Sequence, residues 1–185
     1  MIPVSQLRKG VTFERDGQLY RVLEYQHHKP GRGNAIIRTK LRNLRTGAIT
    51  QETFLSGDRV QDVRLDHRTV QYLYNDGELY YFMDTETYEQ PALHREVVED
   101  IIPYLKEGII VEMESYEGEP IGLQLPTTVD LKVVEAPPGY AGDTATSATK
   151  EVVLETGMRL QVPLFVNAGD VVRVDTRTGE YQTRV

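Results

Sequence analysis

Cysteine is absent from this chain of 185 residues, which excludes a disulfide framework, a thiolate metal site and a cysteine nucleophile. Long apolar stretches are missing as well, since no run approaches the roughly 18 residues that a membrane-spanning helix requires. Residues 1–5 lack the basic and apolar regions of a secretory signal. These absences predict a cytoplasmic protein with no cofactor and no membrane attachment.

Most of the sequence predicts short strands. Alternating stretches are separated by turn signals such as Asp16-Gly17 and the Asn-Asp-Gly of residues 75–77. Units of about sixty residues with several strands each are typical of small barrels. One helix is predicted, over residues 95–102 and ahead of Pro103. We predict an all-β protein of three small β-barrels, with domains at residues 1–64, 65–128 and 129–185.

Charge is distributed unevenly along the chain, although the net charge is only −7. Residues 1–64 carry 12 Lys/Arg and 6 Asp/Glu, a net charge of +6. Residues 65–128 carry 3 and 14, a net charge of −11, and residues 129–185 carry 6 and 8, a net charge of −2. A basic first third predicts that this end binds a phosphate-rich partner which the acidic middle avoids. A chance difference between small domains is the alternative interpretation.

The basic residues gather around one glycine-rich turn. Between residues 21 and 45 a single acid, Glu24, stands among seven cations: Arg21, Lys29, Arg32, Arg38, Lys40, Arg42 and Arg45. Gly31 and Gly33 flank Arg32 and remove side chains from both of its sides. We therefore expect a hairpin that presents Arg32 at its tip, because a planar and permanently charged guanidinium suits phosphate and base contacts. The other cations would bind phosphates along the two strands.

Other interpretations of these residues compete with RNA binding. A flexible hairpin with a solvated basic face would show the same charge pattern. His27 and His28 are adjacent, so on a strand they point to opposite faces and cannot chelate one metal ion together. Asp76 and Glu78 flank a hairpin turn with no signal of a cleft, which favours a solvated surface over a hydrolytic carboxylate pair.

Several motifs are similar to those of one known family. Residues 25–35, with Lys29-Pro30-Gly31-Arg32-Gly33-Asn34 at their centre, resemble the tip of the first domain of elongation factor P. The rest of the chain follows the family's order at residues 41–47, 80–84, 125–129, 137–139, 142–144, 162–166 and 174–181. The resemblance implies an SH3-like (KOW-type) barrel followed by two OB-fold barrels, arranged in an L shape similar to a tRNA.

The resemblance also implies a function. A non-enzymatic translation factor would bind the ribosome between the exit and peptidyl tRNA sites and stimulate peptide bond formation, which relieves stalling at consecutive prolines. It would act as a monomer by positioning peptidyl-tRNA with Arg32, in contact with ribosomal RNA. The residues implied in binding tRNA and the ribosome are Lys29, Pro30, Gly31, Arg32, Gly33, Asn34, Arg38, Lys40, Arg42, Gly142, Asp143 and Thr144.

The tip departs from the pattern in which a lysine receives an extension, because this chain has Arg32 there. The resemblance leaves two alternatives open: rhamnosylation of Arg32 by a tip-modifying arginine rhamnosyltransferase, or action without modification. Rival functions are an elongation factor P-like paralogue, a generic OB-type nucleic-acid-binding protein, and a carbohydrate hydrolase. Gly142-Asp143-Thr144 favours the factor over the paralogue, and a hydrolase would need a paired carboxylate cleft that we do not find.

Overall fold

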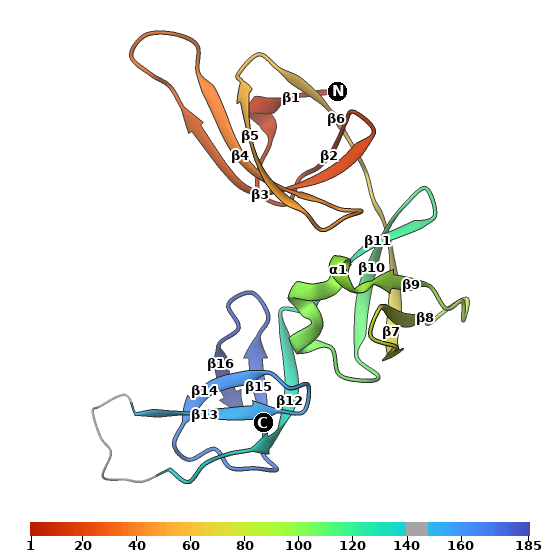
Figure 1. Ribbon diagram of the computed structural model, residues 1–185, viewed down its shortest axis with the longest axis vertical. Helices are drawn as coiled ribbons and strands as arrows, with labels where there is room; N and C mark the ends of the chain where they lie inside the picture. Colours follow the sequence, from red (N-terminus) through yellow and green to blue (C-terminus); the bar gives the residue numbers. More distant parts are fainter. Residues whose placement is uncertain (140–147) are drawn as a thin grey trace. The chain divides into compact units, whose positions relative to one another are not determined.

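The computed structural model describes residues 1–139 and 148–185, which form three antiparallel sheets (Figure 1). The predicted all-β class is therefore confirmed. Contacts divide the chain into two compact units. Unit 1 contains Met1–Arg68, Leu93–Val97 and Met113–Gly122, and unit 2 contains Thr69–Ala92, Val98–Glu112 and Leu123–Val185. The division into three domains that the sequence suggested, with boundaries after residues 64 and 128, stays a prediction.

The first sheet has six strands in the order β1-β6-β2-β3-β4-β5 and curls into a nearly closed barrel. Val4 N donates to Asp58 O at 2.9 Å, and Ser56 N donates to Ala35 O at 3.1 Å. Eight apolar side chains fill the interior, among them Phe13, Ile37 and Leu41, each at most 1% exposed. The elements are β1 (Ile2–Pro3), η1 (Val4–Gln6), β2 (Thr12–Arg15), β3 (Gln18–His28), β4 (Ile36–Asn43), β5 (Ile49–Leu55) and β6 (Arg59–Asp62).

The turns of this barrel follow from their residues. Asp16 and Gly17 have φ of 53° and 76°, so both occupy the left-handed region that a two-residue hairpin loop requires. The predicted turn between β2 and β3 is therefore confirmed. At the end of β4, Asn43 Oδ1 accepts hydrogen bonds from Arg45 N at 2.9 Å and Thr46 N at 3.2 Å, which closes the turn to β5.

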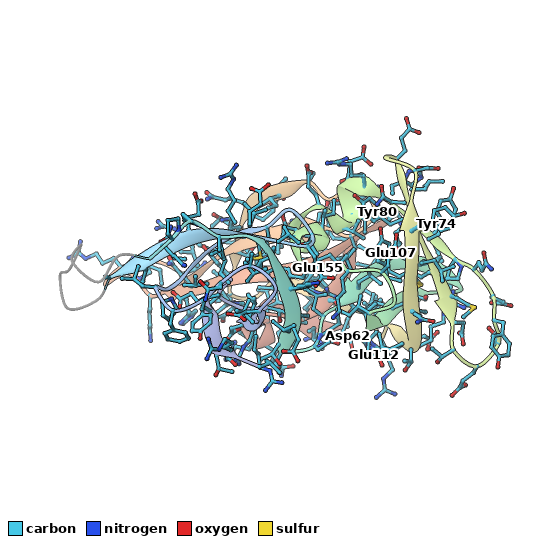
Figure 2. All side chains as sticks on the ribbon, turned by 90° about the horizontal axis from the view of Figure 1, so that it is seen from below. Asp62, Tyr74, Tyr80, Glu107, Glu112 and Glu155 are labelled. Carbon is cyan, nitrogen blue, oxygen red and sulfur yellow. The ribbon has the colours of Figure 1, made fainter. Side chains whose placement is uncertain are left out.

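The second sheet has five strands in the order β11-β10-β7-β8-β9. Tyrosines of β7 and β8 lie on both faces of the sheet (Figure 2): Tyr80 is 4% exposed and stacks on Tyr72, whereas Tyr74 is 50% exposed and stacks on Tyr81. Tyr80 and Tyr81 are neighbours on β8 and point to opposite faces, whereas a register shift in β7 between Tyr72 and Tyr74 places these two on opposite faces. The strands are β7 (Asp66–Asn75), β8 (Leu79–Asp84), β9 (Ala92–His94), β10 (Ile110–Tyr116) and β11 (Glu119–Gln124).

The structure has helical residues where a helix was predicted, over residues 95–102, but only the first turn is α-helical. The α-helix α1 ends after one turn (Arg95–Val98), and the 3₁₀ helix η2 (Glu99–Tyr104) continues the chain. Pro103 lies inside η2. Proline has no N–H, and in an α-helix its ring would collide with the carbonyl four residues earlier, here that of Glu99, so the tighter helix is favoured. No helix of the described chain is long and apolar enough to cross a membrane.

The third sheet has the order β14-β13-β12-β15-β16, and its two outer strands, β14 and β16, contact each other. Its core contains ten buried residues, all of them Val or Leu. Asp130 and Arg173 face each other in register, and the guanidinium donates to both carboxylate oxygens, at 2.9 and 3.2 Å. The strands are β12 (Thr128–Glu135), β13 (Thr149–Leu154), β14 (Arg159–Pro163), β15 (Val171–Asp175) and β16 (Tyr181–Arg184).

Candidate nucleic-acid interface

The candidate site is the hairpin of β3 and β4, residues 18–43, which we call the arm. Its ladder is paired as far as His28 and Ile36, so the connecting residues 29–35 lie beyond the last cross-strand pair. Figure 1 shows this loop extending past the ends of both strands. A bulge at Leu23, between the pairs Val22–Leu41 and Glu24–Lys40, interrupts the register in the middle of β3.

The tip of the arm exposes Arg32. Lys29, Gly31, Arg32, Gly33 and Asn34 are all exposed. Gly33 has φ of 100°, which only glycine adopts readily. Gly31 has no positive φ, and its contribution is the absence of a side chain next to Arg32. Among the described residues, no hydrogen bond or ion pair holds the Arg32 guanidinium. The side chain is therefore available to a partner.

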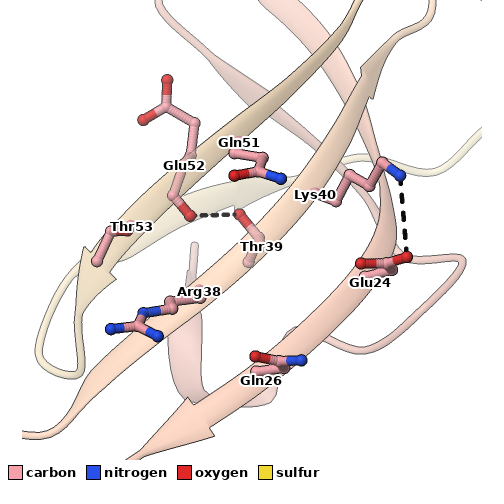
Figure 3. A pocket seen from close by; sticks show the side chains of 8 residues that line it. All are labelled: Glu24, Gln26, Arg38, Thr39, Lys40, Gln51, Glu52 and Thr53. Atoms are coloured by element: carbon pink, nitrogen blue, oxygen red, sulfur yellow. Dashed lines mark hydrogen bonds and ion pairs between the residues drawn. The ribbon is translucent and has the colours of Figure 1, made fainter.

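The outward face of the arm and the neighbouring strand β5 together form a shallow polar groove of about 200 Å³ (Figure 3). Arg38 and Lys40 alternate on β4 with the buried Ile37, Thr39 and Leu41, so the cations point outward. In register, Arg38 lies between Gln26 and Thr53, and Lys40 lies between Glu24 and Gln51.

The two groove cations differ in their surroundings. Lys40 Nζ is 3.9 Å from Glu24 Oε1, a loose ion pair whose side chains are 38% and 66% exposed. Arg38 is exposed, and nothing in the described chain pairs with its charge. The groove therefore offers one free guanidinium, one partly neutralised ammonium and several neutral donors, beside the Glu52 carboxylate, which lies 3.4 Å from Arg15 Nη1.

The cations at the base of the arm have intramolecular partners. Arg21 Nη2 donates to Glu114 Oε2 on β10, a contact within unit 1. Arg45 Nε is 3.5 Å from Glu119 Oε2, and its Nη1 donates to Gly17 O at 3.1 Å. Arg42 is half-buried and lies opposite Arg21 in the ladder. The cations predicted along the arm thus fall into an accessible set near the tip and a structural set at its base.

Sequence reasoning missed a second hollow of about 460 Å³ beside the arm, lined by Arg8, Lys9, Leu23, Glu24, Tyr25 and Gln26. The Arg8 guanidinium lies 4.8 Å from the centre of the Tyr25 ring, and Tyr25 Oη donates to Ser5 O at 3.2 Å. The adjacent cations Arg8-Lys9 were the available signal, but only the fold brings them beside β3. The predicted residues Gly142, Asp143 and Thr144 lie outside the described residues.

Comparisons with known proteins cover the chain from end to end. Three family descriptions match: "Elongation factor P (EF-P) KOW-like domain" over residues 3–60, "Elongation factor P (EF-P) OB domain" over residues 65–123, and "Elongation factor P, C-terminal" over residues 129–184. The elongation factor P of Moorella thermoacetica is 55% identical over 184 residues, with 100% of both chains covered. The chain belongs to the elongation factor P family.

Other elongation factor P sequences are also similar to the chain over its full length. That of a Thermoanaerobacter species (strain X514) is 52% identical over 185 residues, again with both chains fully covered. Among solved structures, "Eukaryotic translation initiation factor 5A from Methanococcus jannaschii" is 24% identical and covers 66% of this chain and 89% of its own, with a TM-score of 0.50; it supports the fold alone.

Membership confirms the expected KOW-like first domain and OB second domain. Elongation factor P is a non-enzymatic translation factor that acts on the ribosome in the cytoplasm, as the sequence predicted for this chain.

Proposed function

We propose that this member of the elongation factor P family binds the ribosome between the exit and peptidyl tRNA sites and relieves stalling at consecutive prolines. The single observation that carries the proposal is the exposed Arg32, which no group in the described chain binds. An arginine held in this way contributes little to folding, so its charge and its five donors are available to RNA. The tip is therefore the part of the molecule that acts on peptidyl-tRNA.

The proposed mechanism is positioning rather than chemistry. Proline reacts poorly because its ring fixes one backbone dihedral and its nitrogen is secondary. Ribosomal RNA forms the peptide bond, and the Arg32 tip holds the end of peptidyl-tRNA in a reactive geometry, which lowers the entropic part of the barrier. Lys29, Arg38 and Lys40 would contact the phosphate backbone and supply binding energy for that ordering, and the half-buried Arg42 at the base is the least accessible of the proposed contacts.

Backbone atoms complete the proposed tip. Pro30 restricts the loop on one side of Arg32, while Gly31, Gly33 and Asn34 let RNA approach the chain closely. The Gly142-Asp143-Thr144 segment is proposed as a second ribosome contact on the strength of the family resemblance.

The test compares Arg32→Ala with a control arginine in a reconstituted translation system that makes a proline run. We expect Arg32→Ala to fold normally, because no described residue contacts its charge, and to lose the stimulation of proline-run synthesis. Arg59→Ala is the control: Arg59 is an exposed arginine on β6 whose Nη2 donates to Met1 O at 3.1 Å. Full stimulation by Arg32→Ala would remove Arg32 from the mechanism.

Modification of the tip is a separate question. Arg32 is the proposed acceptor of a rhamnosyl group from an arginine rhamnosyltransferase, and its exposure makes the guanidinium accessible to such an enzyme. Peptide mass spectrometry of the native protein separates the alternatives: a deoxyhexose on the peptide that contains Arg32 supports modification, and an unmodified mass supports action by the bare guanidinium.

A further inference from the structure

Arg21 on β3 and Glu114 on β10 are 93 residues apart in sequence, and their ion pair links the two strands. Glu114, on β10, has a side chain that is only 8% exposed, and that of Arg21 is 25% exposed. A buried carboxylate is costly unless a cation and hydrogen bonds compensate it. The Arg21 guanidinium supplies both, so the two side chains depend on each other.

Such a pair constrains the geometry of the groups around it more than it adds to the net stability of the fold. A buried ion pair often adds no more stability than apolar residues of similar size would, because desolvation offsets the attraction. A charge-assisted hydrogen bond is nevertheless directional, and it loses much of its strength when its atoms are displaced. The pair therefore favours one arrangement of β3 against β10 over nearby alternatives.

Several weaker contacts surround the pair at the same place. Leu19, Leu44 and Ile121 form a small buried apolar cluster at the base of the arm. Tyr116 Oη donates to Glu14 Oε2 at 3.4 Å, and desolvation, followed by the nearby Glu117 carboxylate, raises the pKa of Tyr116, so its hydroxyl keeps the proton. The base of the arm is thus attached to β10 and β11 within unit 1, with the ion pair as the most directional contact.

We infer that Arg21 and Glu114 are positioning residues, which fix the direction in which the arm projects and hence the location of Arg32. A small rotation at the base is amplified along the arm, because His28 lies seven positions after Arg21, a span of about 23 Å at the usual rise of a strand. A rotation of about 5° at the base would move the far end by about 2 Å. This inference rests on the proposed function of the tip, because misplacement matters only if Arg32 must reach one geometry.

The direct test measures the direction of the arm without translation. Since the chain has no cysteine, spin labels can be placed at the two exposed positions Asn34→Cys, on the tip, and His94→Cys, on β9 in unit 1. Pulsed electron paramagnetic resonance then gives the distribution of distances between the labels. We expect Glu114→Gln to broaden this distribution about twofold relative to the parent, because the neutral amide binds arginine less strongly.

Glu119→Gln is the matched control, since Glu119 pairs with Arg45 at the same base but is 54% exposed. It should leave the distribution unchanged. Arg21→Lys keeps the charge and loses the planar fork, so it should give intermediate broadening and serves if Glu114→Gln fails to fold. A distribution in Glu114→Gln and Arg21→Lys as narrow as in the parent would overturn the inference.

A translation assay, as the second part of the test, separates an effect on positioning from an effect on binding. In proline-run synthesis we expect Glu114→Gln to lower the maximal rate about tenfold while the factor concentration for half-maximal stimulation changes by less than about twofold, because misplacement acts on the oriented complex. An equal loss with Glu119→Gln would contradict a specific role for the buried pair. If instead Arg32→Ala retained full activity, the proposed function would fail, whereas the label distances would still decide whether the pair directs the arm.

Discussion

Gly47 and Gly17 provide a matched pair of substitutions in the first barrel. Their φ angles are nearly equal, 77° and 76°, and both lie in turns between neighbouring strands. They differ in what surrounds them. A Cβ on Gly47 would lie 2.7 Å from the backbone carbonyl oxygen of Glu96, whereas a Cβ on Gly17 would meet nothing within 4 Å. Both Gly47 and Glu96 belong to unit 1.

The two substitutions should therefore cost different amounts of unfolding free energy. The left-handed conformation costs an alanine about 1–2 kcal/mol, and both variants share this term. For Gly47, the 2.7 Å approach falls 0.7 Å short of the 3.4 Å at which ordinary contact begins. The obstructing atom belongs to the backbone and cannot rotate away, so overpacking adds about 1–3 kcal/mol. We expect Gly17→Ala to cost about 1–2 kcal/mol and Gly47→Ala about 2–5 kcal/mol.

Urea unfolding followed by far-ultraviolet circular dichroism measures the difference. Amide hydrogen exchange in β3 and β4 assigns the loss to unit 1. In thermal unfolding, each kcal/mol should lower the midpoint by about 2–4 °C for a chain of this length. Equal losses in the two variants would show that the turn at Gly47 does not press against Glu96, and the close packing at the base of the arm would be refuted.

Two further predictions concern charged side chains. Hydrogen bonds from Arg173 hold the pKa of Asp130 below its ordinary value. The stability that this pair contributes is therefore present above the pKa of Asp130 in the unfolded state and is lost as the pH falls through its pKa in the folded state. Arg173→Met should raise the titration midpoint of Asp130 measured by carboxyl NMR, and an unchanged midpoint would contradict this cause. The second prediction concerns ribosome binding measured at several salt concentrations. Arg38→Ala should reduce the slope of log K against log salt concentration by about 0.7–0.9, whereas Arg45→Ala should change it little, because Glu119 already pairs with Arg45. Equal changes would show that both arginines reach phosphate.

Local features of the fold could be predicted from the sequence because their causes are local. Asp16-Gly17 specifies its turn through two left-handed residues, and the exposure of Arg32 follows from the glycines beside it. The outward direction of Arg38 and Lys40 follows from the period of two along a strand whose other face is buried. Apolar spacing at residues 95–102 indicated a helical segment but did not distinguish α from 3₁₀ geometry, which Pro103 influences.

The partners of the arm's cations could not be predicted, because they come from distant parts of the chain. Glu114 and Glu119 belong to strands that the sequence places in another domain, and nothing near Arg21 indicates that it will be partly buried. The hollow beside Arg8 and Tyr25 depends likewise on how η1 lies against β3. Charge patterns report how many cations a segment has, while the fold decides which of them stay accessible.

This division of the cations bears on how the arm could select its partner. If all seven Lys/Arg between residues 21 and 45 were free, the arm would attract any polyanion through a long row of point charges. Instead, Arg21 and Arg45 are paired with carboxylates at the base, Lys40 is close to Glu24, and Arg32 and Arg38 remain accessible towards the tip. Non-specific attraction is thereby reduced while the direction of the arm is constrained. Under the proposed function, binding would then depend on a partner that offers phosphates where the tip can reach them, which favours one shaped site over bare nucleic acid.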